Sequence, residues 1–158
     1  MTVVCFLGEQ GTDVQYELLS RETAREALIT YSFAEPFRNS LAVETVSLGA
    51  AVSLCNDLEW YLVRFVDQTI IREPSITDNE WLSRPLATAV RDEKISPAET
   101  GERLAIYGVV DESLVEPMYV TRRYKNADNS DKTLPSYDLR QVNQTVVVRI
   151  TANEFGEC

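Results

Sequence analysis

The residues best suited to bind another molecule lie between positions 119 and 125, where basic and aromatic side chains alternate. They are Tyr119, Arg122, Arg123, Tyr124 and Lys125. A guanidinium group can hold a phosphate while a tyrosine ring stacks on a base. The segment therefore predicts a candidate ligand-binding site for a nucleic acid or an adenine nucleotide. The structural alternative, which the sequence favours, is an edge strand whose charges deter aggregation.

Pairs of neighbouring carboxylates offer a second chemistry. Asp57 with Glu59, or Asp111 with Glu112, could act as an acid and a base or hold Mg²⁺. In a chain with 25 acidic residues, however, such neighbours also arise by chance. A carboxylate-dependent metal enzyme is therefore a second alternative, and no catalytic or metal-binding residue can be named for it.

The glycines that follow the first apolar run could belong to a phosphate-binding loop. Gly8, Gly11 and Thr12 occupy the right place, between a predicted strand and the next element. Their spacing matches neither G-x-G-x-x-G nor G-x-x-x-x-G-K-[ST]. A plain turn is the better interpretation, and no cofactor is expected.

The complete absence of histidine excludes more chemistry than any residue that is present. Histidine is the side chain whose ordinary pKa lies near neutrality. Without it, serine or cysteine hydrolysis through a histidine base, histidine-bound zinc and two-histidine iron centres are excluded. The leading hypothesis is a non-enzymatic interaction or regulatory module that acts on a protein partner or a small ligand.

Charge is the strongest global feature, with 25 acidic against 15 basic residues and a formal net charge of −10. Such a field repels nucleic-acid phosphates and anionic membranes. The lysines are few, namely Lys94, Lys125 and Lys132, and the carboxylates are spread along the whole chain. This pattern predicts a halophilic protein, because concentrated salt screens the repulsion between carboxylates.

The sequence predicts a cytoplasmic protein without a membrane segment. No stretch approaches the roughly 18 apolar residues of a membrane span, and the first residues lack the pattern of a signal peptide. Cys5, Cys55 and Cys158 form no C-x-x-C pair, so neither a disulfide framework nor a zinc site is expected. Cys5 and Cys55 are interpreted as small buried hydrophobic residues.

The chain is predicted to form a single domain over residues 1–158, with a flexible loop at 125–135. Apolar and β-branched runs predict strands at 2–7, extended at 14–18, and at 145–150, with hairpins at 60–73 and 104–124. Helices are predicted at 20–31, at 41–58, from 77 to 90 with a kink or fresh start at Pro85, and at 96–103. For 41–58, a strand at 41–47 that leads into a shorter helix is the alternative.

These elements predict an α+β fold, an antiparallel sheet of hairpins with helices packed on one face. A faint repeat supports a duplicated helix-hairpin unit as one interpretation. LGAAV at 48–52 matches LATAV at 86–90, and FVDQTIIREP at 65–74 matches VVDESLVEP at 109–117. Chance similarity between two hairpins is the other interpretation.

Two resemblances to known families add to these expectations. VVDESLVEPMYVT, at 109–121, resembles the hairpin of cystathionine-synthase-type nucleotide-sensing modules, although Glu116-Pro117 replaces their usual glycine and a plain structural hairpin is preferred. YELLSRETAREALITY, NSLAVETVSLGAAVSL, NDLEWYLVRFVD, EWLSRPLATAVRD and YGVVDESLVEPMYVTR together resemble a family of short acidic haloarchaeal proteins known as a domain of unknown function. That resemblance implies cytoplasmic residence in a halophile, and it implies no activity and no site residue.

Overall fold

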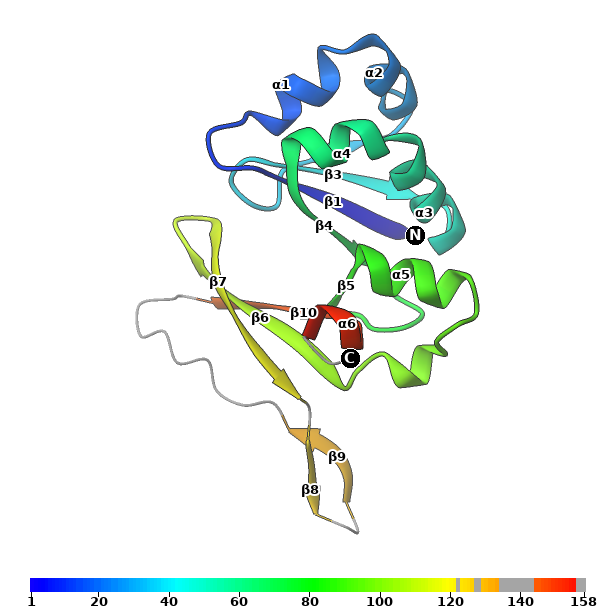
Figure 1. Ribbon diagram of the computed structural model, residues 1–158, viewed down its shortest axis with the longest axis vertical. Coiled ribbons are helices and arrows are strands. Elements are labelled where there is room, and N and C mark those ends of the chain that lie inside the picture. The colour runs from blue at the N-terminus through cyan, green and yellow to red at the C-terminus, as the bar shows by residue number, and fades with distance from the viewer. Residues whose placement is uncertain (122, 127–128, 134–143, 156–158) are drawn as a thin grey trace.

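The computed structural model describes residues 1–121, 123–126, 129–133 and 144–155, and the statements below concern these residues (Figure 1). For Glu116 and for residues 123–126 and 129–133, the description is of the backbone.

The strands form an 8-stranded sheet in the order β2-β3-β1-β4-β5-β10-β6-β7, and a separate pair, β8 with β9. Their bounds are β1 Thr2–Gly8, β2 Phe33–Ala34, β3 Ser40–Thr45, β4 Val66–Arg72, β5 Trp81–Ser83, β6 Arg103–Val110, β7 Ser113–Thr121, β8 Arg123–Asn126, β9 Asn129–Thr133 and β10 Gln144–Arg149. Neighbouring strands are antiparallel except for β10 and β5, which are parallel. The large sheet is therefore mostly antiparallel, as the α+β prediction required.

The helices begin where short polar side chains accept hydrogen bonds from free backbone N–H groups. Asp13, Ser47 and Ser83 accept such bonds at the first turns of α1, α3 and α5. The helices are α1 Val14–Leu19, α2 Glu22–Leu28, α3 Leu48–Asp57, α4 Glu59–Phe65, α5 Arg84–Arg91 and α6 Ala152–Phe155, with a 3₁₀ turn at Pro97–Glu99. None of the helices in these parts of the chain combines the length and the apolar character needed to cross a bilayer.

Two hydrophobic clusters cover the two faces of the sheet. Because side chains alternate along a strand, β1 directs Val4 and Phe6 into the first cluster, and Cys5 and Leu7 into the second. Helices α1 to α5 all contribute to the first cluster, whereas Phe155 of α6 packs against the second. The prediction that the helices pack on one face is therefore not confirmed.

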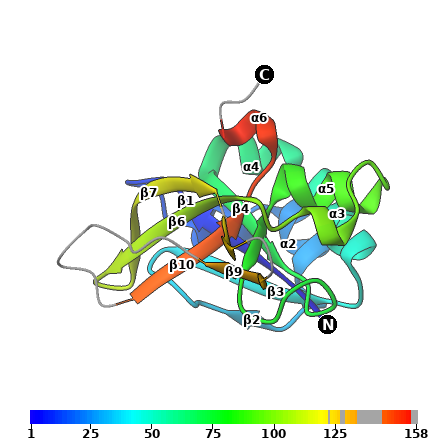
Figure 2. The ribbon, with the colours of Figure 1, turned by 90° about the horizontal axis from the view of Figure 1, so that it is seen from below.

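Strand β5 joins two halves of the sheet and is short. It pairs with β4 through Ile70↔Ser83 and Ile71↔Leu82, and with β10 through Val148↔Trp81 and Arg149↔Leu82. On one side lie β2, β3, β1 and β4, and on the other lie β10, β6 and β7 (Figure 1). Seen from below, the second half crosses in front of the first (Figure 2). Within the sheet, the two halves are therefore joined by two residue pairs on each side of β5.

The predicted helix over 41–58 is wrong, and its alternative is correct. Residues Ser40–Thr45 form β3, and α3 begins at Leu48. The Ser47 side chain accepts a hydrogen bond from the N–H of Ala50 at 3.1 Å, which fixes the start of the helix. The strand is buried on both faces, so its continuous apolar pattern looked helical.

The hairpin predicted at 60–73 is also wrong. Residues Glu59–Phe65 form α4, and β4 follows directly from Val66. Leu58, Leu62 and Phe65 recur at helical spacing, and Leu58 and Leu62 are buried in the first cluster. Asp67-Gln68, predicted as the turn, lies inside the strand.

Other boundaries differ less. The strand extension at 14–18 is wrong, because these residues form α1, and the helix predicted at 20–31 is shorter, as α2. The helix predicted from 77 to 90 is wrong before residue 84, because Trp81–Ser83 form β5. Its fresh start is correct, since α5 begins at Arg84 with Pro85 in its first turn. The predicted helix at 96–103 is reduced to its 3₁₀ turn. The strands at 2–7 and 145–150 are confirmed as β1 and β10. The hairpin predicted at 104–124 is confirmed up to Thr121 as the β6–β7 pair, Arg122 lies outside the described residues, and residues 123–124 belong to β8.

The duplicated unit is not confirmed. LGAAV and LATAV both lie in helices, α3 and α5, but the two matched hairpin sequences differ in structure. Asp67 lies within β4, whereas Asp111 lies in the turn between β6 and β7. Part of the segment 125–135 belongs to β8 and β9, and residues 127–128 and 134–135 lie outside the described residues, so its flexibility stays a prediction.

Candidate ligand-binding site

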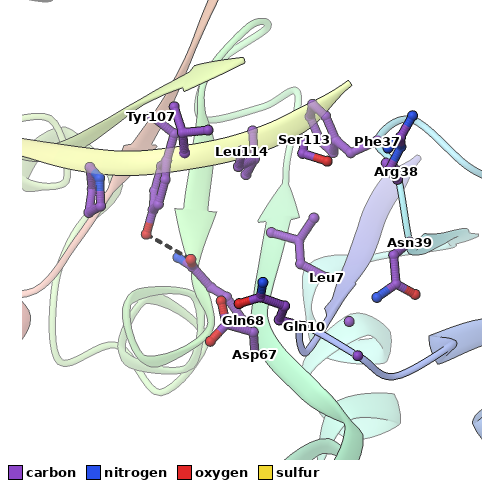
Figure 3. A pocket seen from close by; sticks show the side chains of 14 residues that line it. Leu7, Gln10, Phe37, Arg38, Asn39, Asp67, Gln68, Tyr107, Ser113 and Leu114 are labelled. Atoms are coloured by element: carbon purple, nitrogen blue, oxygen red, sulfur yellow. Dashed lines mark hydrogen bonds between the residues drawn. The ribbon is translucent and has the colours of Figure 1, made fainter. Parts of the chain in front are cut away.

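A cavity of about 590 Å³ lies between the two halves of the sheet (Figure 3). One wall comes from the ends of β1 and β4 and the loop before β3, and the other comes from β6 and β7. The lining residues are Leu7, Gly8, Gln10, Gly11, Phe37, Arg38, Asn39, Asp67, Gln68, Tyr107, Ser113, Leu114, Val115 and Pro117. This size lies within the range of sites for small molecules.

The apolar part of the lining continues the second hydrophobic cluster. Leu7 and Phe37 are each 9% exposed, and Leu114 packs against the same cluster from β7. The Phe37 ring lies 6.5 Å from the Trp81 ring, centroid to centroid, so the core supports the cavity wall. A ligand that reaches this wall would contact a packed surface with few free rotamers.

A hydrogen bond crosses the cavity between the two halves of the sheet. The Tyr107 hydroxyl of β6 donates to Gln68 Oε1 of β4 at 2.7 Å (Figure 3). Burial raises the pKa of the Tyr107 phenol, although the bond to Gln68 acts in the opposite direction. The phenol is therefore protonated at neutral pH, and the Gln68 amide nitrogen keeps its two N–H donors for another acceptor.

Both charge signs are present in the lining. Arg38 and Asp67 lie apart on the wall formed by the first half of the sheet, and both side chains are exposed (Figure 3). Within the described residues, neither side chain forms an ion pair or a hydrogen bond, and the same holds for the side chains of Gln10 and Ser113. These four groups are available to a ligand.

Irregularities in two strands shape the cavity walls. The register between β1 and β4 shifts at Leu7/Gly8, so that Gln68 pairs with Leu7 and Val66 pairs with Gly8. Val66 is consequently packed in the first cluster, and Asp67 is directed to the cavity rim. A second shift lies between β6 and β7 at Tyr107/Gly108. Bulges of this kind redirect side chains and occur often beside functional sites.

Contacts from both halves of the sheet hold Arg38 at the cavity, namely those within the loop before β3 and one with the β6–β7 turn. The Ser40 hydroxyl accepts from Phe37 N at 3.0 Å and donates to Phe37 O at 2.7 Å, which fixes the loop before β3. The backbone N–H of Arg38 donates to the carbonyl oxygen of Glu112 at 2.7 Å. This bond joins the loop to the β6–β7 turn, whose residues Asp111 and Glu112 have φ angles of 51° and 67°. The two halves are thus held together at this end of the cavity.

Asn39 organises the loop between β1 and α1. Its side chain donates to the carbonyl oxygens of Glu9 and Thr12 at 3.2 and 2.5 Å and accepts from Val14 N at 2.9 Å. Asn39 has a φ of 55°, a left-handed conformation that asparagine tolerates better than most residues. The interpretation of Gly8 and Gly11 as a plain turn holds, but both glycines also line the cavity.

The five residues of the sequence-predicted site are not brought to this cavity. Tyr119 lies in β7, is 53% exposed, and contacts the Phe155 ring edge to face at 6.4 Å. Arg122 lies outside the described residues, and Arg123, Tyr124 and Lys125 lie in β8, where the backbone alone is described. Binding at 119–125 therefore stays a prediction.

The carboxylate pairs do not form a recognisable centre. Glu59 pairs with Arg84 at 2.5 Å across the surface, and Asp111 and Glu112 are exposed turn residues. Within the described residues, no three His, Cys, Asp or Glu side chains lie close enough together to hold a metal ion.

Sequence reasoning missed most of the cavity because its residues come from separated segments. No motif in the sequence indicates Arg38 or Ser113, and the sequence predicts Asp67-Gln68 as a turn. Tyr107, which lies within the hairpin predicted at 104–124, is on the cavity wall.

Comparison with known proteins gives one result. No curated protein and no solved structure matches the chain. One family model, a Family of unknown function (DUF5804), matches residues 2–109, which include β1 to β5 and β6 without its last residue. The match covers more than half of the sequence and confirms the expectation of a family without known function, while haloarchaeal origin stays a prediction. The matched range includes all of one cavity wall and Tyr107 of the other. Because the match covers more than half of the sequence, the chain belongs to the DUF5804 family of unknown function.

Proposed function

We propose that this chain is a non-enzymatic regulatory module that binds a small molecule in the cavity between the two halves of its sheet. The observation that carries the proposal is the combination of an apolar wall with four polar side chains that have no partner in the described residues. Binding sites for small molecules share this composition, mostly apolar with a few convergent polar groups.

The position of the cavity supports a regulatory role. Its two walls belong to halves of the sheet that β5 joins through two residue pairs on each side. A ligand in contact with both walls stabilises one relative arrangement of the halves, because it binds that arrangement more tightly than others. The relative position of the exposed surfaces of the two halves then depends on whether the ligand is bound.

The test is nuclear magnetic resonance titration of the ¹⁵N-labelled protein with a fragment library in concentrated KCl. We expect chemical shift changes to concentrate at residues 7–11, 37–39, 67–68 and 107–117. Leu114→Arg, which fills the cavity, should abolish them, while Val63→Arg on the exposed surface of α4 should not. Shifts confined to other regions would contradict the cavity as the site, and consumption of the bound compound would contradict the non-enzymatic role.

A protein partner is a second part of the proposal, and one exposed surface favours it. Tyr16 of α1 and Trp60 and Val63 of α4 are 65%, 50% and 67% exposed. The Arg64 guanidinium carbon lies 3.8 Å from the Trp60 ring centroid, and in the described residues this guanidinium pairs with no carboxylate. An aromatic residue beside an unpaired cation suits an acidic partner segment.

The partner surface is tested with synthetic peptides that combine glutamate and leucine, using Trp60 fluorescence as the signal. Trp81→Phe removes the second tryptophan, so the fluorescence comes from α4. We expect the peptide to quench the Trp60 fluorescence or shift it to the blue, and we expect Arg64→Gln to weaken this change. Val46→Ser, at a 79% exposed residue between β3 and α3, serves as the matched surface control. No change with any acidic peptide would contradict this surface.

The remaining proposals concern the environment and the alternative site. The net charge of −10 supports residence in a salt-rich cytoplasm, for which the melting temperature should rise as KCl increases from about 0.1 to about 3 M.

Nucleotide or nucleic-acid binding at 119–125 predicts retention on a phosphate matrix that Arg122→Ala with Arg123→Ala abolishes. Unchanged retention in this double variant would remove the alternative.

A further inference from the structure

We infer that the ligand of the cavity is a small zwitterion with an apolar side chain, of the chemical class of a free α-amino acid. This inference rests on the proposed function and specifies its ligand. It follows from the charges, the hydrogen-bond donors and the apolar surface that line the cavity.

The charged groups are placed to hold the two ends of one small molecule. Ser40 of β3 and Gln68 of β4 both pair with Leu7 of β1, so Arg38 and Asp67 flank the end of that strand. Two strand spacings of about 4.8 Å separate the backbones of β3 and β4. Because the arginine side chain is long, its guanidinium can approach the carboxylate of a ligand whose ammonium group faces Asp67.

The neutral groups favour a carboxylate as well. Gln68 uses its oxygen to accept from Tyr107, so its amide nitrogen presents N–H donors to the cavity. The Ser113 hydroxyl can add another donor from the opposite wall. Ser113 follows Glu112, whose carbonyl oxygen accepts from Arg38 N, so the Ser113 hydroxyl and the Arg38 fork lie near each other and can both donate to one carboxylate.

The apolar wall favours a ligand with an apolar side chain. Leu7, Phe37 and Leu114 lie beside the polar groups, and the volume of about 590 Å³ leaves room for an aliphatic or aromatic side chain. Burial of that side chain supplies affinity in concentrated salt, where exposed ion pairs are screened.

The same lining disfavours other ligand classes. A phosphate or a dicarboxylate would place a second negative charge near Asp67 in a protein of net charge −10. A simple cation would meet Arg38, and an uncharged apolar molecule would cover both charged groups without pairing them. A zwitterion satisfies both charges at once.

The test is isothermal titration calorimetry in concentrated KCl with L-leucine and L-phenylalanine as probes. N-acetyl-L-leucine lacks the ammonium group, and L-leucinamide lacks the carboxylate. We expect at least one of the two amino acids to bind, and the derivatives of leucine to bind roughly tenfold or more weakly than leucine itself. Equal affinity for leucine and both derivatives would overturn the inference.

Two variants assign each charge to its partner. Arg38→Gln should remove the preference for leucine over leucinamide, and Asp67→Asn should remove the preference for leucine over N-acetyl-leucine. Both side chains are exposed and unpaired, so the variants should keep the melting temperature of the parent protein. Arg25→Gln, an exposed position on α2, is the control and should bind as the parent does.

Failure of this inference is distinguishable from failure of the proposed function. If fragments of another charge pattern shift the cavity resonances while amino acids do not bind, the zwitterion is wrong and the ligand-binding module stands. If no compound of any charge pattern perturbs the cavity, both are wrong.

Discussion

The backbone N–H of Gly8 donates to the carbonyl oxygen of Asn39 at 2.8 Å, and a Cβ atom at Gly8 would lie 2.5 Å from Asn39 Nδ2. The Asn39 side chain cannot move away freely, because it also holds Glu9, Thr12 and Val14. The close contact at Gly8 and the order of the β1–α1 loop therefore depend on the same side chain, that of Asn39.

Gly8→Ala should destabilise the protein by about 1–3 kcal/mol, the usual cost of overpacking. Gly49→Ala is the control, because a Cβ there meets Ser47 Oγ at 3.8 Å and the residue lies in α3. Gly49 lies in the first turn of α3, where alanine has space and should not lower the stability. Urea unfolding measures both, and equal stability of the two variants would contradict the close contact.

Two substitutions at Asn39 separate its backbone conformation from its hydrogen bonds. Asn39→Gly keeps the φ of 55° accessible but loses the three side-chain bonds, and Asn39→Ala loses the bonds and strains the backbone. We expect Asn39→Ala to be less stable than Asn39→Gly by about 1 kcal/mol. Thermal unfolding with hydrogen exchange at residues 9–14 checks this order, which the reverse ranking would contradict.

The ion pair between Arg149 and Glu80 should contribute more than an ordinary surface pair. The nitrogen and oxygen atoms lie 2.7 Å apart, and the side chains are only 13% and 15% exposed. Arg149 also donates to the Thr100 hydroxyl at 2.9 Å. Arg149→Met should cost about 3 kcal/mol, since it breaks a buried charge pair and the bond to Thr100, and adding Glu80→Gln should recover part of this loss.

The control for that prediction is Arg21→Met, which breaks the ion pair with Glu17. The Arg21 side chain is 42% exposed and the Glu17 side chain is 24% exposed. Its cost should stay below about 1 kcal/mol. Chemical unfolding of the four proteins gives the comparison, and an equal loss in Arg149→Met and Arg21→Met would refute it.

The thiols of Cys5 and Cys55 should be inert in the folded protein. Burial raises the pKa of Cys5 to about 12 and that of Cys55 to about 11, and the thiolate is the reactive form. In a Cys158→Ser variant, a thiol reagent at pH 8 should label nothing until guanidinium chloride unfolds the chain, after which both thiols react. Rapid labelling of the native variant would show that one of these side chains is accessible.

Glu73 should make stability depend on acid pH. Burial alone would raise the pKa of this carboxyl group, but hydrogen bonds from the Thr2 hydroxyl and the Ser75 backbone hold it below its ordinary value of 4.5. A carboxyl group with a lowered pKa stabilises the fold above its unfolded-state pKa, and the contribution disappears as pH falls through the folded-state value.

The stability difference between the parent protein and Glu73→Gln should therefore be constant above about pH 5 and shrink below pH 4.5. Urea titrations at several pH values measure it, with the exposed Glu44→Gln as the control. A difference that does not change across this range would contradict the assigned hydrogen bonds.

The local parts of the fold could be predicted from sequence, and the elements whose state depends on distant contacts could not. The β6–β7 hairpin was evident because Asp111-Glu112 separates two apolar runs. The residues of α4 have strong β propensity, yet burial of Leu62 beneath the helix outweighs it. The cavity was not predictable, because Leu7, Asp67 and Tyr107 meet only through the strand order and two register shifts.

The position of β10 has a consequence for how the protein is made. This strand is translated after β5 and β6 but separates them in the finished sheet. On the ribosome, β6 can pair with β7 alone, and β5 with β4 alone, until residues 144–149 emerge. The first half of the molecule can therefore acquire structure during synthesis. The sheet of the second half joins it only when β10, a late strand, inserts between β5 and β6.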